Sequence, residues 1–530
     1  MIDSAAAMPL AVAEMLILAT AGFSVYRRRG ASVAESIAFG TLLPWMTLSF
    51  LYQVLFIIRL PSAAAIVETG LTIVALGVLF RERSALRRDT KAFLHFAADR
   101  PVPVGFLSIL LVVLFAQALT TAAPETEQEM LTRLLASDPA PSGPALNQGT
   151  LAAVCNHPPA GPAHWNPAIV GLRFAGDRSA SGMNLPGFFA YLTVVFGTYA
   201  LARRYAWPAT AFAVAVMVAS MPRLVLLARS PGLELLPAAA TLFALLSLYR
   251  TVESPNAADL GGFLIAAAFS ISQVWMSRVS AMMLLPLGSV VLFRRHGIAI
   301  WLQTIRQQWL LICGTLAVIL VFSQAWWWVL HRSAEPLSAP LETVIYNTDG
   351  IQGAAANLIR YLLQSLHIPP VIDTFFRWAF HFEPSRLIEA LYFRLLDPFL
   401  GSVGAAADFR LTATLQLPTA WFGPLGGLIV LPAVAYCTRR APRRLKAVAI
   451  MLAGYFFLAS LILAWLPQIA RQFTLFYVCG GFCAAYFLPP WYFGPRIRGM
   501  LIGFSLALLA YGTVTGTPGL IPVSLPVLFD

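Results

Sequence analysis

Long apolar runs alternate with short polar ones along most of the chain. A helix that crosses a bilayer needs roughly 20 apolar residues, and runs of about that length recur throughout. The segments that we interpret as predicted spans are 8–26, 34–58, 62–80, 103–122, 186–202, 208–228, 232–250, 259–276, 278–293, 309–330, 421–437, 447–466, 473–489 and 499–517. The pattern predicts an all-α polytopic membrane protein with about 13 transmembrane helices, in which 259–293 makes two half-length crossings that meet around "WMSRVS".

Basic residues gather in short runs between the apolar segments. These runs lie at 27–29, 81–91, 203–204, 294–297, 439–446 and 496–498. Short basic loops that alternate with neutral ones are typical of the cytoplasmic side of a membrane protein. If the first span runs from outside to inside, every basic run falls inside and two long loops, 123–185 and 331–420, fall outside. We therefore expect a multi-pass plasma (inner) membrane protein with its long loops on the periplasmic or extracellular side.

The composition is typical of a membrane protein, and the distribution of charge argues against a nucleic-acid-binding function. The chain has 530 residues, of which 58% are hydrophobic and 11% are charged. The net charge of +12 is explained by the basic inner runs, so a nucleic-acid partner is not expected. The beginning, "MIDSAAAMPLAVAEM", lacks a basic region, so it does not resemble a cleaved signal peptide. Five cysteines show no pairing or metal-ligand pattern.

The second long loop contains one amphipathic stretch, "AANLIRYLLQSLHI" at 355–368. Its leucines recur at helical spacing, with Arg360 and Gln364 on the opposite side. We expect this helix to lie in the plane of the membrane interface. Aromatic side chains such as Trp165 and Trp326 are candidates for contacts with sugar or lipid.

Three glutamates follow the fourth predicted span in "APETEQEMLTRLLASD", which covers 123–138. The segment fits a hydrated acidic helix start after Pro124, and it also fits a catalytic base at the membrane surface, since a carboxylate can take the proton of an acceptor hydroxyl. Glu129 precedes the apolar continuation "MLTRLL", which would hold it against the membrane, whereas Glu125 and Glu127 are expected to be more hydrated.

Four arginines lie inside apolar runs or at their predicted outer turns, namely Arg223, Arg229, Arg278 and Arg471. A guanidinium within a bilayer costs several kcal/mol, so such residues usually face a cavity or a partner. Together they are suited to holding a phosphate. For Arg223 and Arg229, snorkelling to the lipid headgroups fits equally well. Soluble-enzyme motifs such as a P-loop or G-x-S-x-G are absent, and Lys91 and Lys446 both lie in predicted inner loops.

The order of several segments resembles the GT-C membrane glycosyltransferases, in the bacterial branch related to protein O-mannosyltransferases and aminoarabinose transferases (family 39-like). The segments are "APETEQEMLTRLL", "SMPRLVLLARSPGLELLPAAATLFALLSLY", "FLIAAAFSISQVWMSRVSAMMLLP", "NTDGIQGAAANLIRYLLQSLHIP" and "LILAWLPQIARQF". The resemblance implies a GT-C-like core over 101–490, which includes both outer loops. Residues 1–100 are additional N-terminal helices, and 491–530 form a C-terminal helix and tail.

The resemblance also implies an activity: transfer of a hexosyl or pentosyl group from a polyprenyl-phosphate donor to a glycan, lipid or protein acceptor at the outer face. Glu129 matches the catalytic acidic position, with Glu127 its nearest rival. The four arginines match basic positions that bind the donor phosphate, and Glu234 matches an acidic helix start. No metal or other cofactor is expected, and a divalent cation is left open.

The chain also departs from the family pattern. Members usually carry Asp at the first position with Tyr and His shortly after, whereas Glu129 is followed by Thr132 and Arg133, and the later loop reads "LTATLQLPTAWFGPLGG". Two other functions therefore stay open. One is a transporter or flippase for lipid-linked substrates, although no internal duplication is visible. The other is a non-catalytic membrane scaffold with the same fold.

Overall fold

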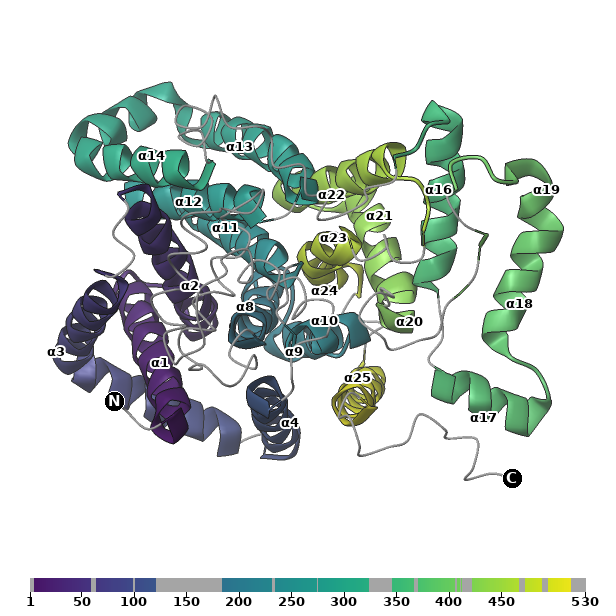
Figure 1. Ribbon diagram of the computed structural model, residues 1–530, viewed down its shortest axis with the longest axis horizontal. Coiled ribbons are helices and arrows are strands. Elements are labelled where there is room, and N and C mark those ends of the chain that lie inside the picture. The colour runs from purple at the N-terminus through teal and green to yellow at the C-terminus, as the bar shows by residue number, and fades with distance from the viewer. Residues whose placement is uncertain are drawn as a thin grey trace, which may run out of the picture. The chain divides into compact units, whose positions relative to one another are not determined.

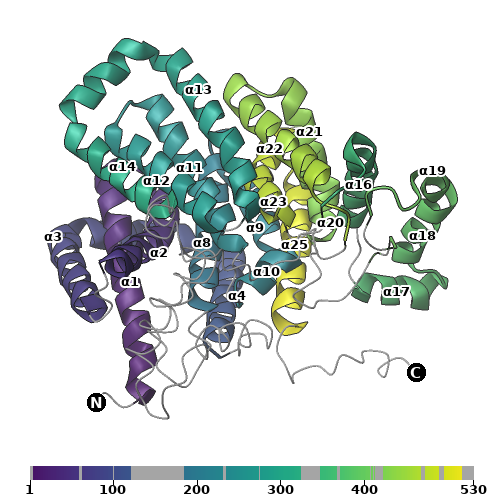
Figure 2. The same cartoon turned by 45° about the horizontal axis from the view of Figure 1, so that its top comes forward.

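The protein is helical throughout the part that the computed structural model describes (Figures 1 and 2). The described residues are 4–58, 63–98, 101–120, 184–230, 234–273, 275–323, 346–366, 370–405, 408–409, 411, 422–466, 472–488 and 494–515. Within these residues there is no β-strand, and two isolated bridges join Tyr346 to Leu463 and Ala405 to Trp465. The chain divides into two compact units, each described here by itself.

Unit 1 contains Met1–Ala200, Leu227–Arg278 and Val290–Leu341. Its helices are α1 (Ser4–Arg28), α2 (Val33–Ile57), α3 (Ala64–Ala98), α4 (Pro101–Thr120), α8 (Leu185–Ala202), α11 (Leu235–Glu253), α12 (Ala257–Gln273), both ends of α13 (Trp275–Gln307) and α14 (Trp309–Ser323). Helix α11 is buried on every side, as expected for a helix that is apolar all round. It is therefore the central helix of this unit.

Helices α1 and α2 lie against each other through a close backbone contact at glycine. A Cβ placed on Gly40 would lie 2.5 Å from the carbonyl oxygen of Ala19 and 2.7 Å from the amide nitrogen of Phe23. On α1, a Cβ on Gly22 would lie 3.1 Å from the Cα of Gly40. Small residues at such crossings let the backbones of membrane helices approach closely.

The helix ends predicted to face inside meet in an inner-end network, which consists of Arg29, Glu35, Arg250 and Asp259. Arg250 Nε donates to Asp259 Oδ1 at 3.2 Å, and Arg250 Nη1 lies 3.8 Å from Glu35 Oε2. Arg250 Nη2 also donates to the carbonyl of Arg29 at 3.0 Å. The three charged side chains that pair here are buried. Four helix ends from distant parts of the sequence are thus joined as the basic-run pattern predicts.

Local sequence explains why Glu35 is available to this network. Ser32 and Glu35 form a capping box at the start of α2: Glu35 Oε2 accepts a hydrogen bond from the Ser32 amide at 2.8 Å, and Ser32 Oγ accepts one from the Glu35 amide at 3.3 Å. The carboxylate is thereby fixed in the first turn of the helix, where it also meets Arg250. Glu35 therefore both caps the start of α2 and connects α2 to α11.

Unit 2 contains Leu201–Leu226, Val279–Ser289 and Glu342–Asp530. Its helical segments are α9 (Pro208–Ala219), α10 (Pro222–Leu227), the middle of α13, α16 (Gly350–Ser365), α17 (Pro370–Phe380), α18 (Pro384–Leu391), η3 (Tyr392–Leu396), α19 (Asp397–Leu400), α20 (Gly423–Leu425), η4 (Gly426–Val430), α21 (Leu431–Arg440), α22 (Arg443–Ile462), α23 (Thr474–Gly480), η6 (Gly481–Cys483), α24 (Ala484–Phe487) and α25 (Pro495–Thr515). Part of the predicted outer loop 331–420 is therefore a series of helices, α16 to α19.

Helix α16 covers most of the predicted amphipathic stretch, but it turns its polar side toward the protein. Asn357 donates to the carbonyl of Leu463 at 2.9 Å, and Tyr361 donates to that of Ala464 at 3.2 Å. Arg360 is 1% exposed, and its guanidinium binds the Tyr392 hydroxyl and the loop that follows it. Arg360 and Gln364, on the side opposite the leucines, are therefore buried, and the predicted position of this helix in the membrane interface stays a prediction.

Apolar helices coincide with most of the predicted spans. By length and composition, four helices in the described residues can cross a membrane: Val33–Leu55, Leu185–Ala202, Leu235–Glu253 and Arg443–Ile462. Shorter apolar helices are Val104–Thr120, Pro208–Ala219, Ala257–Ser272, Trp309–Phe322 and Thr474–Phe487. These helices are typical of a membrane protein.

Several predicted spans differ from the helices observed. The span 208–228 is interrupted between α9 and α10, because Pro222 has no amide hydrogen to continue the first helix. Helix α3 does not end at the basic run but continues to Ala98. The break predicted around "WMSRVS" falls between α12 and α13, and α13 continues past its predicted end with a kink at Gly297, whose φ is 71°.

Candidate functional site

The predicted site residues are distributed over both units and over the parts of the chain outside the description. Glu127, Glu129 and Arg471 lie outside the described residues, as do Trp165 and Trp326. Arg278 belongs to the first turn of α13, and its side chain is not among those described. Arg223 lies in unit 2, whereas Arg229 and Glu234 lie in unit 1. The structure therefore describes three of the predicted site residues, Arg223, Arg229 and Glu234. It also describes the helix ends that precede and follow the acidic segment.

The helix ends on either side of the first predicted outer loop are held next to each other in unit 1. Asn184, directly before α8, donates from Nδ2 to the carbonyl of Ala118 in the last turn of α4 at 3.2 Å. This hydrogen bond satisfies one of the carbonyls that a helix end leaves without a partner. The rings of Phe115 and Phe188 pack one turn deeper, with centroids 4.9 Å apart. The described ends of the chain on either side of residues 121–183 thus lie at one place.

Arg229 lies at this same place. It is 4% exposed, and its Nη1 donates at 3.3 Å to Gln117 Oε1 of α4, the helix labelled in Figure 1. Burial lowers the pKa of Arg229 to about 10, so the guanidinium remains positively charged at neutral pH. Arg229 therefore provides a buried positive charge at the base of the acidic loop.

A glycine brings the turn that carries Arg229 against α8. A Cβ on Gly187 would collide with the carbonyl oxygen of Leu227 and would lie 2.5 Å from that of Ser230. Ser230 is 3% exposed, and within the described residues its hydroxyl has no hydrogen-bond partner. Buried hydroxyls are normally paired, so a ligand oxygen at this position would satisfy it. We call Gln117, Asn184, Gly187, Arg229 and Ser230 the outer-end cluster.

Burial decides between two interpretations of the arginines. A snorkelling arginine extends its guanidinium into the headgroup region and leaves it exposed. Arg223 in α10 is 1% exposed and Arg229 is 4% exposed, so both side chains are enclosed by protein. Both guanidiniums are therefore enclosed by protein, which does not fit the snorkelling interpretation.

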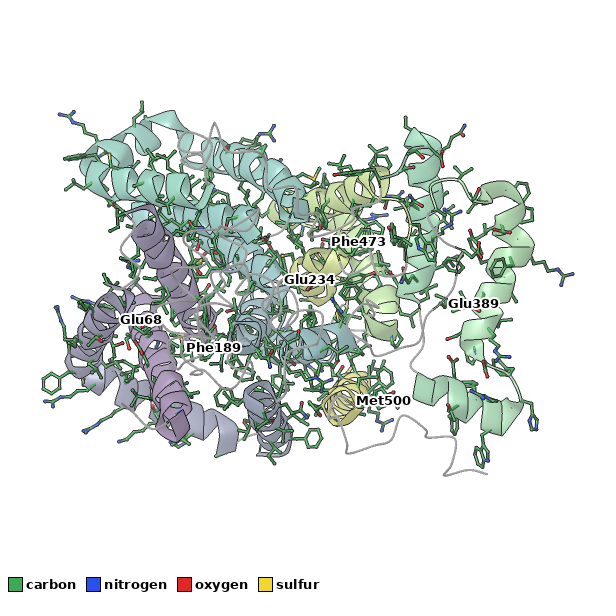
Figure 3. The ribbon with its side chains drawn as sticks, viewed as in Figure 1. Glu68, Phe189, Glu234, Glu389, Phe473 and Met500 are labelled. Carbon is green, nitrogen blue, oxygen red and sulfur yellow. The ribbon has the colours of Figure 1, made fainter. Side chains whose placement is uncertain are left out.

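Glu234 begins α11, as the sequence predicts for an acidic helix start (Figure 3). A carboxylate at this position interacts favourably with the positive end of the helix dipole. It follows Arg229 by five residues along the chain and belongs to the same unit. Its predicted role in substrate binding remains a prediction.

The outer-end cluster and the inner-end network lie at opposite ends of α11. This helix has 19 residues, which corresponds to a length of about 28 Å at 1.5 Å per residue. The hydrocarbon core of a bilayer is about 30 Å thick. The spacing therefore fits a site at one membrane surface and a network of charged side chains at the other.

Sequence reasoning did not identify three polar members of the outer-end cluster: Gln117, Asn184 and Ser230. Each lies within a few residues of the end of an apolar run, and that position is the signal that could have revealed them. In the described residues no group of three or more His, Cys, Asp or Glu side chains is suited to holding a metal ion.

Comparison with protein-family models, with curated proteins and with solved structures gives no match. The resemblance to GT-C glycosyltransferases therefore rests on the order of the sequence segments.

Proposed function

We propose that the protein is an integral-membrane glycosyltransferase that moves a sugar from a polyprenyl-phosphate donor to an acceptor at the outer face. The observation that carries the proposal is the position of Arg229, buried and hydrogen-bonded to Gln117 at the base of the loop that contains Glu127 and Glu129. A fixed guanidinium is well suited to binding phosphate, and the Ser230 hydroxyl adds a second polar group next to it in the chain.

The proposed reaction joins these groups in one step. The acceptor hydroxyl oxygen attacks the anomeric carbon of the sugar, and Glu129 takes the hydroxyl proton. The bond between the anomeric carbon and the phosphate oxygen breaks, and its electron pair stays on the polyprenyl phosphate that leaves. Arg229 stabilises the negative charge that develops on this phosphate. Glu127 is the alternative base, and Arg223, Arg278 and Arg471 are further candidates for donor binding.

Glutamate substitutions in the full-length protein test the proposed base. Glu129→Gln is expected to reduce the surface glycan made by the producing cells by roughly 100-fold or more, since general-base catalysis typically contributes about 10²–10⁴. Glu125→Gln is the matched control in the same segment and is expected to keep activity. Loss in Glu127→Gln alone would transfer the role to Glu127. Full glycosylation in both the Glu127 and Glu129 variants, at normal expression, would show that neither carboxylate is the catalytic base.

Reconstituted protein distinguishes the transferase from a transporter. Proteoliposomes that contain undecaprenyl-phosphate sugars and an outer-face acceptor extract are expected to yield a glycosylated product. Movement of the lipid-linked sugar across the bilayer without any covalent product would instead support a flippase. Arg229→Gln is expected to weaken use of the donor, because it removes the charge while keeping a polar side chain.

A further inference from the structure

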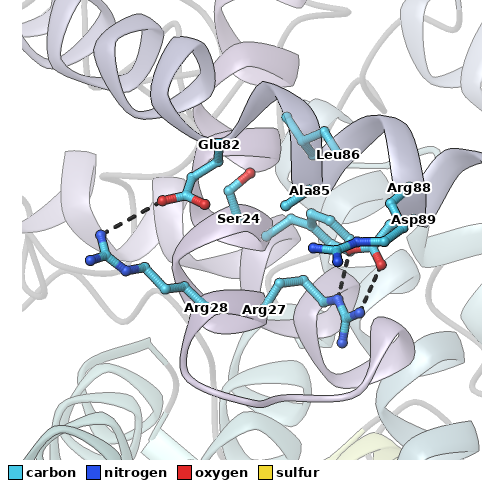
Figure 4. A pocket seen from close by; sticks show the side chains of 9 residues that line it. Ser24, Arg27, Arg28, Glu82, Ala85, Leu86, Arg88 and Asp89 are labelled. Carbon is cyan, nitrogen blue, oxygen red and sulfur yellow. Dashed lines mark hydrogen bonds and ion pairs between the residues drawn. The ribbon is translucent and has the colours of Figure 1, made fainter.

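A second charged site lies at the opposite end of unit 1, between the last turn of α1 and the part of α3 beyond its apolar half (Figure 4). It is a pocket of about 320 Å³, close to the lower limit of the roughly 300–1,000 Å³ that is typical of small-molecule sites. Five charged side chains line it: Arg27, Arg28, Glu82, Arg88 and Asp89. All belong to runs that the sequence places on the inner side.

The pocket exists because α3 continues as a helix past its apolar half. Glu82, Ala85, Leu86 and Asp89 recur at spacings of three and four residues and so share one face, which looks toward α1. A helix ending at the basic run, as the apolar pattern predicts, would leave these side chains without a fixed direction. The extension of α3 therefore builds one wall of the pocket.

An ion pair fixes the two walls relative to each other. Arg27 binds Asp89 with two hydrogen bonds, from Nε at 2.8 Å and from Nη2 at 2.7 Å, and Arg27 Nη1 donates to the carbonyl of Ala31 at 2.6 Å. The hydrogen bonds from Arg27 lower the pKa of the Asp89 carboxyl, which therefore stays ionised at neutral pH. Arg27 is thus a positioning residue, and its charge is compensated within the pocket wall.

The remaining cations that line the pocket, Arg28 and Arg88, are exposed. Arg28 Nη1 lies 3.6 Å from Glu82 Oε1, and the Arg28 side chain is 59% exposed (Figure 4). Arg88 is exposed and forms no ion pair in the part of the chain that the structure describes. Exposed cations on the same stretch of α3 are Arg81, Arg83, Arg87, Arg88 and Lys91. The surface is therefore strongly positive and suited to an anion.

The same helix carries an exposed apolar surface that leads to these cations. Ile73 is 63% exposed and Phe80 is 70% exposed, and both precede the first arginine of the run. Apolar side chains followed by a basic cluster match the change from acyl chains to headgroups at a membrane surface. Basic clusters directly next to a membrane span commonly bind acidic phospholipids.

We propose that this pocket binds the headgroup of an anionic phospholipid of the inner leaflet. The phosphate lies between Arg28 and Arg88, with the acyl chains along the exposed apolar side chains of α3. Arg27 and Asp89 hold α1 and α3 at the separation that the headgroup needs. The site is independent of the proposed transferase site, because it lies at the other end of the unit and uses none of its residues.

Native mass spectrometry of the full-length protein in detergent tests the proposal. Dioleoyl phosphatidylglycerol and dioleoyl phosphatidylcholine are titrated separately, because they share acyl chains and differ in charge. Wild-type protein is expected to prefer the glycerol lipid. The double variant Arg28→Gln/Arg88→Gln is expected to bind it about 30-fold more weakly, since each basic residue near an anionic surface is worth about 1 kcal/mol. Arg28→Lys/Arg88→Lys is expected to keep the preference.

The matched control is Arg439→Gln/Arg440→Gln, which removes two exposed arginines from another predicted inner end, that of α21. This variant is expected to bind like the wild type. Equal weakening in both glutamine variants would overturn the site, because it would show a general charge effect. Binding of inorganic phosphate alone as tightly as the glycerol lipid would also overturn it, in favour of a small-anion site. Thermal unfolding of each variant confirms that the comparison is made on folded protein.

Discussion

Two buried arginines at opposite ends of α11 have different surroundings. Arg250 contacts the carboxylates of Asp259 and Glu35, so its charge is compensated inside the protein. Arg229 donates to the neutral amide of Gln117 at the base of the acidic loop. Breaking a buried ion pair is strongly destabilising. Arg250 is therefore expected to hold four helix ends together.

At the residue scale, the Arg27–Asp89 pair makes a pH-dependent contribution to stability. The pKa of Asp89 is lowered in the folded protein by the hydrogen bonds from Arg27. A carboxyl with a lowered folded pKa stabilises the protein above its unfolded pKa, which is about 3.9, and this contribution is lost as the pH falls through the folded value. Asp89→Asn is expected to lower the free energy of unfolding by about 0.5–1 kcal/mol at neutral pH.

Unfolding midpoints of the wild type and Asp89→Asn, measured from neutral to acidic pH, check this prediction. The difference is expected to be constant above about pH 5 and to shrink below about pH 4, where Asp89 becomes protonated. High salt is expected to reduce the difference between the two unfolding midpoints at neutral pH, because the Arg27–Asp89 pair is partly exposed. A difference that persists unchanged at low pH would show that Asp89 acts through packing.

Individual residues also show what the sequence can predict about the site. Arg223 and Arg229 were identifiable because a charge in an apolar run is costly and therefore conspicuous. Gln117, Asn184 and Ser230 carry no charge, and neutral polar residues at span ends are common. Their contact depends on how α4, α8 and the Arg229 turn pack, which no local pattern contains.

At the scale of elements, the contact between α1 and α2 depends on Gly40. Replacing glycine by alanine inside a helix normally stabilises it by roughly 0.5–1 kcal/mol. At Gly40 the new methyl group would collide with the backbone of Ala19 and Phe23, which belong to a rigid helix. Gly40→Ala is therefore expected to destabilise the protein by about 1–3 kcal/mol, measured as a lower unfolding midpoint in detergent.

Gly77 provides the matched control for this substitution. It lies inside α3, and no atom approaches within 4 Å of the position that its Cβ would take. Gly77→Ala is expected to leave stability unchanged or to raise it slightly. Equal effects of the two substitutions would mean that the approach of α1 and α2 is looser than the structure shows.

Helix α16 shows why the direction of an amphipathic helix is difficult to predict. The spacing of its leucines predicts a helix at about the observed place. The spacing does not show that its polar side is buried, where Asn357, Arg360 and Tyr361 bind backbone carbonyls of neighbouring segments. In a protein rich in apolar surface, polar side chains supply specific interior contacts. Periodicity in the sequence shows which residues share a face of a helix. Tertiary packing decides which face is buried.

At the scale of the whole molecule, the alternation of basic and neutral ends predicts which helix ends share a side. Within unit 1 this prediction agrees with the structure at three places. Arg250 joins the ends of α1, α2, α11 and α12. His296 of the run "RRHG" contacts the carbonyl of Thr251 at 3.1 Å. Asn184 and Arg229 join the predicted outer ends. The chain order alone does not require these contacts, so they agree with the predicted grouping of helix ends, and which group faces the cytosol stays a prediction.

Cysteine labelling of the full-length protein tests the orientation itself. With the native cysteines replaced, a single cysteine is introduced at Arg386 in α18 or at Lys91 in α3, both of which are exposed. The basic-run pattern places Arg386 outside and Lys91 inside. A membrane-impermeant maleimide is therefore expected to label Arg386→Cys in intact cells and Lys91→Cys only after permeabilisation. The reverse pattern would place the acidic loop in the cytosol, where the proposed transfer at the outer face is impossible. The lipid site on α3 would then face the other leaflet, so this measurement decides the sidedness of both sites.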